Sequence, residues 1–241
     1  MAPLLAPEKQ VAAPPRIPLP DTLRGFCVLL MCLYHFAYDL YFICGFSQSV
    51  IDRPLISMMQ ILSSRGFILL AGCSCCLSRS NLRRGGKLLF CGLVVSVITW
   101  LWGDFIPFGI LHFLGAAMLL YALLAPMLER LPAVPSFAVC IILFMLAYAH
   151  FPRLTSLPWL FPMGWVTPHF YSSDYWPMLP WFFLFLVGTV CGTWLSRLPR
   201  PLSSLSIPGL TFLGRHALAV YLIHQPVLVG VCLLGKRLLS P

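Results

Sequence analysis

The sequence predicts an all-α fold, a polytopic transmembrane helix bundle of about seven spans. Of the 241 residues, 59% are hydrophobic and only 10% are charged, whereas a soluble domain has about 25% charged residues. Apolar runs recur along the chain at lengths that suit a hydrocarbon layer of about 30 Å, which a helix of about 20 residues crosses. Most of the charge lies in short segments between these runs. A soluble surface cannot be built from this composition.

Seven apolar runs are candidates for spanning helices, and the third is short. They cover residues 25–46, 54–78, 87–103, 106–128, 134–151, 177–196 and 213–234. Residues 1–20 are rich in Pro and Ala, so we expect a disordered tail, followed at 21–241 by one transmembrane domain without an internal repeat. A cleavable signal is not expected, because the first apolar run starts late and is long enough to span.

The basic residues predict the orientation of these spans. With the N-terminus in the cytoplasm, the inner segments carry eleven Lys or Arg residues and the outer segments four, which is the asymmetry of the positive-inside rule. The loop from Arg79 to Lys87 contributes most to it, whereas Lys236 and Arg237 lie on the outer side. No contiguous basic domain exists, so the net charge of +9 does not indicate a nucleic-acid partner.

Two other features of the sequence bear on function. The ten cysteines lie within or beside apolar runs, and no pair has zinc-ligand spacing with a second pair, so no metal site is expected. Residues 152–176 combine prolines with many aromatic residues, which predicts an ordered cap on the outer face. A lid or acceptor platform and a plain interfacial anchor are both open interpretations of this segment.

Ionisable side chains inside the predicted spans are candidate functional residues, because charge is costly in hydrocarbon. His35 and Asp39 are four residues apart and share a helix face. Arg24 precedes His35 by eleven residues, which places it on the same face about 16 Å nearer the cytoplasm. Other spans contribute polar side chains between the midplane and the outer half, so a shared polar cavity is expected; they are Arg65, His112, His224 and Gln225.

An imidazole with a carboxylate one turn away is suited to general-base chemistry. We therefore interpret His35, oriented by Asp39, as a base. The structural alternatives are an Asp39–Arg65 ion pair that fixes helix register and single histidines that hydrogen-bond a neighbouring helix. Asp21, after Pro20, is placed either to cap the first helix or to contact a ligand.

Several motifs in this chain resemble those of one family. They are Asp21-Thr-Leu-Arg24-Gly25 followed by Tyr34-His35-Phe-Ala-Tyr-Asp39, Arg65-Gly-Phe-Ile-Leu-Leu-Ala-Gly72, Phe108-Gly-Ile-Leu-His112-Phe-Leu-Gly115, Ser173-Asp-Tyr-Trp-Pro-Met-Leu-Pro180-Trp, and Leu213-Gly-Arg215-His-Ala-Leu-Ala-Val-Tyr221-Leu-Ile-His224-Gln225-Pro226. Together they resemble bacterial membrane proteins with the heparan-alpha-glucosaminide N-acetyltransferase catalytic domain, over residues 16–235. The spacing from Arg24 to His35 also resembles the acyltransferase-three membrane O-acyltransferases, in which that arginine and histidine are needed for transfer.

The resemblance implies a transmembrane acyltransferase that takes an acyl group from cytoplasmic acyl-CoA to an amine or hydroxyl acceptor, usually a sugar, on the other side. In the lysosomal enzyme that names the domain, the first helix lacks a histidine at the place of His35, and the catalytic histidine lies in the following lumenal loop. The corresponding loop here, 47–53, contains no histidine. The heparan sulfate substrate is therefore not carried over, and acyltransferase-three chemistry is the closer guide for His35.

These arguments combine into an inner (plasma) membrane acyltransferase with acyl-CoA, acetyl-CoA by default, as its co-substrate. Asp21, Arg24 and Arg215 are expected at the acyl-CoA site. His35 and Asp39 are expected to be catalytic, and Arg65, His112, His224 and Gln225 to bind the acceptor, a small molecule or glycan. One alternative is a proton-coupled transporter, since midplane His, Asp and Arg also form proton relays. Another is a non-catalytic membrane protein that retains the scaffold.

Overall fold

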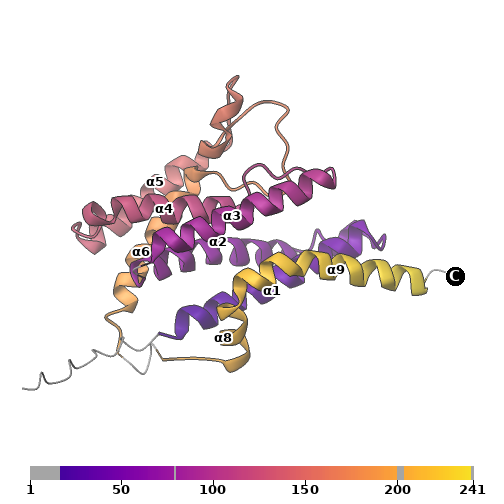
Figure 1. Ribbon diagram of the computed structural model, residues 1–241, viewed down its shortest axis with the longest axis horizontal. Coiled ribbons are helices and arrows are strands. Elements are labelled where there is room, and N and C mark those ends of the chain that lie inside the picture. Colours follow the sequence, from indigo (N-terminus) through magenta and orange to yellow (C-terminus); the bar gives the residue numbers. More distant parts are fainter. Residues whose placement is uncertain (1–16, 79, 200–203, 240–241) are drawn as a thin grey trace, which may run out of the picture.

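The computed structural model describes residues 17–78, 80–199 and 204–239 (Figure 1), and its regular structure there is almost entirely helical, as predicted. The α-helices are α1 (Leu19–Phe42), α2 (Pro54–Cys76), α3 (Asn81–Leu101), α4 (Ile110–Leu128), α5 (Ala133–Ala149), α6 (Met178–Leu195), α8 (Pro208–Arg215) and α9 (Ala217–Leu239). Two short 3₁₀ helices, η1 (Gln48–Val50) and η2 (Pro158–Met163), and two strands, β1 (Arg153–Leu154) and β2 (Trp165–Val166), complete it. Residues 1–16 of the predicted tail lie outside the described residues.

Within the described residues, six helices, α1 to α4, α6 and α9, are long and apolar enough to cross a membrane. The seventh predicted span is α5, an apolar helix of 17 residues, which is the lower limit of spanning length. The third predicted span is not short, because α3 begins at Asn81, before the apolar run, and has 21 residues. Its first turns contain Arg83, Arg84 and Lys87. Hydropathy places these basic residues outside the apolar run, but the backbone helix includes them.

The directions of the helices indicate that α5 also crosses. Gln225 of α9 contacts Asp39 of α1, and Lys236 contacts the carbonyl of Ile43, so residue numbers rise together and α1 and α9 are parallel. Two parallel spanning helices need an odd number of crossings between them. The helices α2, α3, α4 and α6 provide four, and α5 supplies the fifth.

The core lies where α2, α4 and α6 meet. Phe113 of α4, Phe185 of α6 and Ile68 of α2 are completely buried. Glycines let α2 and α6 approach closely, because a Cβ on Gly72 would overlap the carbonyl of Phe185. Small residues at helix contacts are the usual means of tight packing in membranes, where burying apolar surface gives no driving force between helices.

The predicted span 213–234 is in fact two helices. α8 ends at Arg215 and α9 begins at Ala217, with His216 outside helical geometry between them. α8 crosses the N-terminal part of α1, where Gly25 faces the carbonyl of Leu210 and Gly214 faces that of Asp21. α9 instead lies along the C-terminal part of α1 (Figure 1). One straight helix cannot make both contacts, so the break at His216 allows them.

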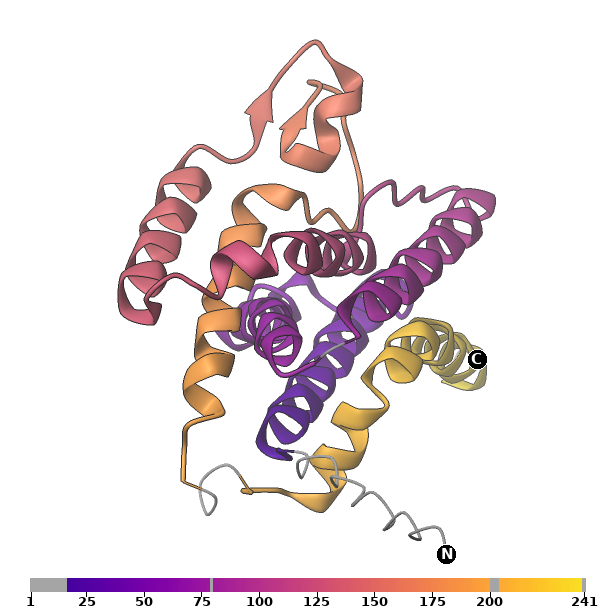
Figure 2. The same cartoon turned by 60° about the vertical axis from the view of Figure 1, so that its left-hand side comes forward.

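The segment between α5 and α6, which we name the outer cap after the side of the membrane expected from the sequence, contains β1, η2 and β2. Figure 2 shows it at one end of the molecule, opposite the N-terminal end of α1. Strands β1 and β2 pair in parallel. At the C-terminal end of the segment, Ser173 donates to Asp104 over 2.7 Å, and the amide of Trp176 donates to the carbonyl of Phe108 over 3.0 Å. These bonds tie the segment to the α3–α4 connection.

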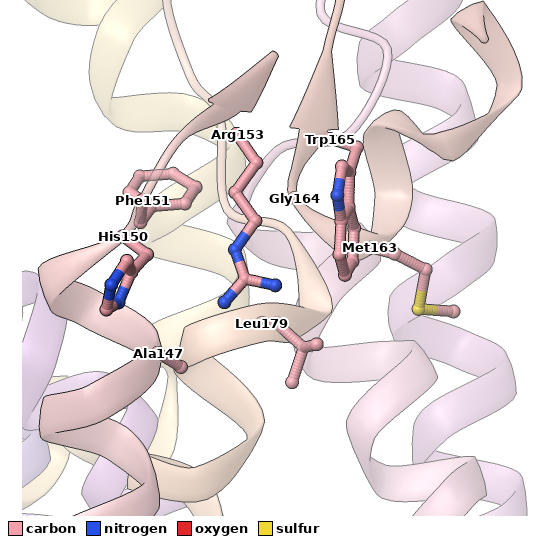
Figure 3. Close-up of a pocket in the computed structure, with 8 residues that line it drawn as sticks. All are labelled: Ala147, His150, Phe151, Arg153, Met163, Gly164, Trp165 and Leu179. Carbon is pink, nitrogen blue, oxygen red and sulfur yellow. The ribbon is translucent and has the colours of Figure 1, made fainter. Parts of the chain in front are cut away.

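A small cavity lies beneath this segment (Figure 3). Arg153 extends into it from β1, between His150 and the indole of Trp165, whose ring centre is 5.1 Å from the guanidinium carbon. The volume of about 20 Å³ is enough for one water molecule. A sugar-sized acceptor does not fit in this cavity.

Candidate functional site

Polar side chains of α1 form two clusters with residues from the other helices. The first, named the inner cluster because it lies at the end of α1 that is expected to face the cytoplasm, surrounds Asp21, which is 3% exposed; the second, further along α1, is named the outer cluster. Arg24 donates to the carboxylate of Asp21 over 2.8 Å, and Arg215 of α8 lies 3.7 Å from the other carboxylate oxygen. The structure thus brings together the three residues expected at the acyl-CoA site. Asp21 lies inside α1 rather than at its N-cap, which is Pro18, so its place is in an ion-pair cluster and not in a cap.

α2 and α3 complete this inner cluster. Arg24 also donates to the hydroxyl of Ser74, and Arg84 of α3 donates to the backbone carbonyl of Ser74 over 3.2 Å. Sequence reasoning used Arg84 only as an orientation signal, because nothing in the sequence pairs α3 with α2 at Ser74. Three arginines against one carboxylate leave excess positive charge within this cluster.

A surface cavity of about 380 Å³ opens beside the inner cluster. Its lining residues come from the start of α1 and from α8 with the segment before it; they are Pro18, Ser206, Pro208, Thr211, Phe212 and Arg215. Arg215, half exposed, lines both the cavity and the cluster. Its guanidinium can therefore reach a ligand in the cavity while still facing Asp21.

The outer cluster joins α1 to α9. The rings of His35 and His224 are 4.9 Å apart in an edge-to-face arrangement. Gln225 donates to one carboxylate oxygen of Asp39 over 2.9 Å. No hydrogen bond links His35 to Asp39 among the described residues, so Asp39 holds Gln225 and the neighbour of the His35 ring is His224. Asp39 and His224 are buried, at 6% and 9% exposure.

Three polar atoms of this cluster are buried without a hydrogen-bond partner in the described part of the chain. They are Oδ2 of Asp39, Nε2 of His224 and Oε1 of Gln225. Buried polar groups in proteins are normally hydrogen-bonded, and exceptions call for an explanation such as a functional role. The outer cluster therefore has free capacity to bind a ligand.

Arg65 lies outside both clusters. Its guanidinium donates to the hydroxyl of Tyr148 over 3.2 Å and lies 6.0 Å from the ring centre of Trp181. Cys27 of α1 packs against Gly66, so Arg65 is at the level of Cys27, about 12 Å along the helix axis from His35. The alternative of an Asp39–Arg65 ion pair is thus not observed, because Arg65 points to α5 and α6.

His112 lies in the first turn of α4 and is hydrogen-bonded on both ring nitrogens. Its Nε2 is 3.2 Å from the hydroxyl of Ser96, and its Nδ1 accepts from the amide of Gly109 over 3.2 Å. The expected cavity shared by all the polar residues is therefore not formed: His35 meets His224, whereas Arg65 and His112 have separate partners. The position of a residue within an apolar run predicts its depth in the membrane but not which neighbouring helix its side chain faces.

Asp174 links the outer cap to this region and was not identified as a site residue from the sequence. Its Oδ2 accepts from the amide of Ile110 over 2.9 Å and from the hydroxyl of Tyr221 over 3.5 Å. Tyr221 in turn lies one turn before His224. Burial raises the pKa of the Asp174 carboxyl, and the hydrogen bonds partly offset this. The available signal was an acid in an otherwise aromatic segment.

No group of three or more His, Cys, Asp or Glu side chains suited to a metal is found in the described ranges. The inner cluster offers arginines at one end of α1. The outer cluster, about 16 Å further along α1, offers imidazole, carboxylate and amide groups from α1 and α9.

Comparison with known proteins gives one match. The family model described as "Heparan-alpha-glucosaminide N-acetyltransferase, catalytic" matches residues 16–226. Searches of curated proteins and of solved structures give no match. The matched range contains both clusters and all of α1 to α8. The chain therefore belongs to the heparan-alpha-glucosaminide N-acetyltransferase catalytic domain family, as its motifs predicted, and is a multi-pass membrane protein of the acetyltransferase type.

Proposed function

We propose that this protein transfers an acyl group, acetyl by default, from cytoplasmic acyl-CoA to an amine or hydroxyl acceptor, sugar-like in character, on the outer side of the plasma membrane. The observation that supports this most is the presence of two chemically different clusters on one helix. An arginine cluster suits a phosphate-rich donor, and an imidazole cluster suits proton transfer from an acceptor.

The inner cluster would bind the donor. Arg24, Arg84 and Arg215 present guanidinium groups, which pair with phosphate in fixed geometry. The cavity beside Arg215 gives the nucleotide room. Asp21 neutralises part of the charge and holds Arg24 and Arg215 in position, so the arginines are preorganised before acyl-CoA arrives.

The outer cluster would bind the acceptor and remove its proton. His35 faces this cluster from α1, and the unpartnered atoms of Asp39 and Gln225 can accept hydrogen bonds from an acceptor's hydroxyl or amine groups. The thioester would then lie between the clusters, with the pantetheine arm following α1 over the ~16 Å from Arg24 to His35. Attack on the thioester carbonyl gives the acylated acceptor and CoA.

The experiment is a consumption assay for acyl-CoA with purified protein in lipid nanodiscs, against amino sugars and polyols. His35→Ala should reduce transfer by roughly 10²–10⁴-fold and leave acyl-CoA binding near wild type. Arg24→Ala and Arg84→Ala should weaken acyl-CoA binding first. Arg83→Ala is the matched control, because Arg83 is the exposed neighbour of Arg84 and should bind acyl-CoA like wild type.

A proton-coupled transporter predicts a different result. Its midplane histidines would alter ion coupling without any dependence on acyl-CoA. If the wild-type protein binds no acyl-CoA, the acyltransferase proposal loses its donor, and a transport assay in proteoliposomes becomes the next measurement.

A further inference from the structure

The hydrogen bond of His224 to its own helix fixes the position of one ring proton. Nδ1 of His224 lies 2.6 Å from the backbone carbonyl oxygen of Tyr221. A carbonyl only accepts, so Nδ1 must carry the hydrogen. In a neutral imidazole the other nitrogen then has a free lone pair. Nε2 of His224 is therefore a proton acceptor.

This nitrogen lies in a setting that a purely structural histidine does not need. Nε2 is buried and has no hydrogen-bond partner in the described ranges. The ring centre of His35 lies 4.9 Å from the ring centre of His224. The nearby free atoms of Asp39 and Gln225 are also acceptors. By contrast, both ring nitrogens of His112 are satisfied, as expected for a structural role.

We infer that His224 is a second catalytic residue, which takes up the acceptor's proton through Nε2 together with His35. This rests on the proposed acyl transfer. The acceptor's oxygen or nitrogen forms a bond to the thioester carbon and loses its proton to the imidazole pair, and the bond from that carbon to sulfur breaks. The proton then passes to the departing thiolate, which leaves as CoA. Charges and atoms balance without another reactant.

The two neighbouring imidazoles would share one proton. Two imidazolium charges 4.9 Å apart would repel each other, so the pair holds one proton at a time. Asp39 acts one residue away, where it holds Gln225, the chain neighbour of His224, through the 2.9 Å bond. A backbone carbonyl orients His224, as the orienting partner of a catalytic base commonly does.

The first measurement is independent of activity. Nitrogen NMR of histidine-labelled protein in lipid separates rings protonated at Nδ1 from those protonated at Nε2, and His224→Gln identifies the signal of His224 by its loss. The inference requires the Nδ1–H form. A neutral His224 protonated at Nε2 would overturn it, whether or not the protein transfers acyl groups.

The second measurement is single-turnover transfer with His224→Gln and His224→Asn. Asn can keep the donor to Tyr221 and Gln can keep a polar atom near Nε2, but neither takes up a proton. Both should lose roughly 10²–10⁴-fold in rate with acyl-CoA affinity within about threefold of wild type, and the loss should shrink as pH rises, because solvent base replaces the imidazole. His150→Gln is the control: His150 is exposed and makes the same kind of bond, to Leu146.

The outcomes separate the two proposals. If wild type transfers acyl groups and either His224 variant retains a third or more of the rate, His224 is structural and this inference is wrong, while the proposed function stands. If wild type transfers nothing to any acceptor, the proposed function is overturned and the catalytic role of His224 with it. If both variants lose activity only together with folding, measured by thermal unfolding in detergent, the inference is also overturned.

Discussion

Adding one methyl group at the α1–α8 crossing should disrupt the inner cluster. A Cβ on Gly25 would lie 2.6 Å from the carbonyl carbon of Leu210 and closer still to its oxygen, where ordinary contact begins at 3.4 Å. In Gly25→Ala the two helices must therefore separate by at least about 0.8 Å. Arg215 is already 3.7 Å from Asp21, so this separation takes the pair beyond ion-pair range.

Two quantities should change. Forced separation of packed helices costs about 1–3 kcal/mol, which lowers the thermal unfolding temperature in detergent. Arg215, no longer held by Asp21, should lose its charge-assisted contact to the donor, which is worth about 1.5–3 kcal/mol. Acyl-CoA binding should therefore weaken by roughly tenfold or more. Both are measured on the same preparation, by thermal unfolding and by binding of a labelled acyl-CoA.

The control lies in the same crossing helix. Gly209 is also in α8, but a Cβ there meets nothing within 4 Å. Gly209→Ala should keep wild-type acyl-CoA affinity and gain slightly in stability, since Ala favours a helix over Gly by about 0.5–1 kcal/mol. If Gly25→Ala behaves like Gly209→Ala in both assays, the close crossing does not exist and the inner cluster is not built as described.

Three further predictions test the orientation, the outer cap and the position of Arg65. A topology reporter fused at Asn81 should read as cytoplasmic, and an external signal would reverse the orientation. Asp174→Ala should lower the free energy of unfolding by about 0.5–2 kcal/mol, as for other lost helix caps. Asp174→Asn keeps an oxygen that can accept from the amide of Ile110, so its loss should be smaller; equal losses would contradict the capping role. Because burial raises the pKa of Asp174, its stability contribution is present at low pH and lost as pH rises through that pKa, so the unfolding temperature of wild type relative to Asp174→Asn should increase on acidification. Arg65→Gln should lower stability through the lost contact with Tyr148 but leave acyl-CoA affinity unchanged, and a weakened affinity would place Arg65 in the donor site.

The contacts within one helix could be predicted, and the contacts between helices could not. The spacing of Arg24 and His35 places them on one face whatever surrounds them, because helix geometry is fixed. Asp39 also shares that face, but its partner is Gln225, 186 residues away. A helical side chain bonds to whichever neighbour its helix is rotated toward, and that rotation is set by packing. For the same reason Arg65 contacts Tyr148 rather than Asp39.

The ends of helices were the least predictable part of the fold. Hydropathy omitted the basic first turns of α3 and joined α8 to α9 across His216. In both places the backbone follows hydrogen bonding and packing, of α3 against α4 and of α8 and α9 against α1, whereas hydropathy reports only the preference of each side chain for lipid or water.

The amino-acid sequence by itself determined the membrane class, the positions of the apolar helices, the shared face of α1 and, through its motifs, the family. Each depends on composition, on spacing along one helix, or on motif identity, none of which needs knowledge of a neighbour. Only the tertiary structure decided that Arg84 joins Arg24, that His224 rather than Asp39 lies beside His35, and that Arg65 and His112 stand apart. In a bundle whose helices are apolar on most sides, many rotations bury similar area, so the choice among them is made by close contacts such as Gly25 on Leu210 and by the pairing of a few polar groups.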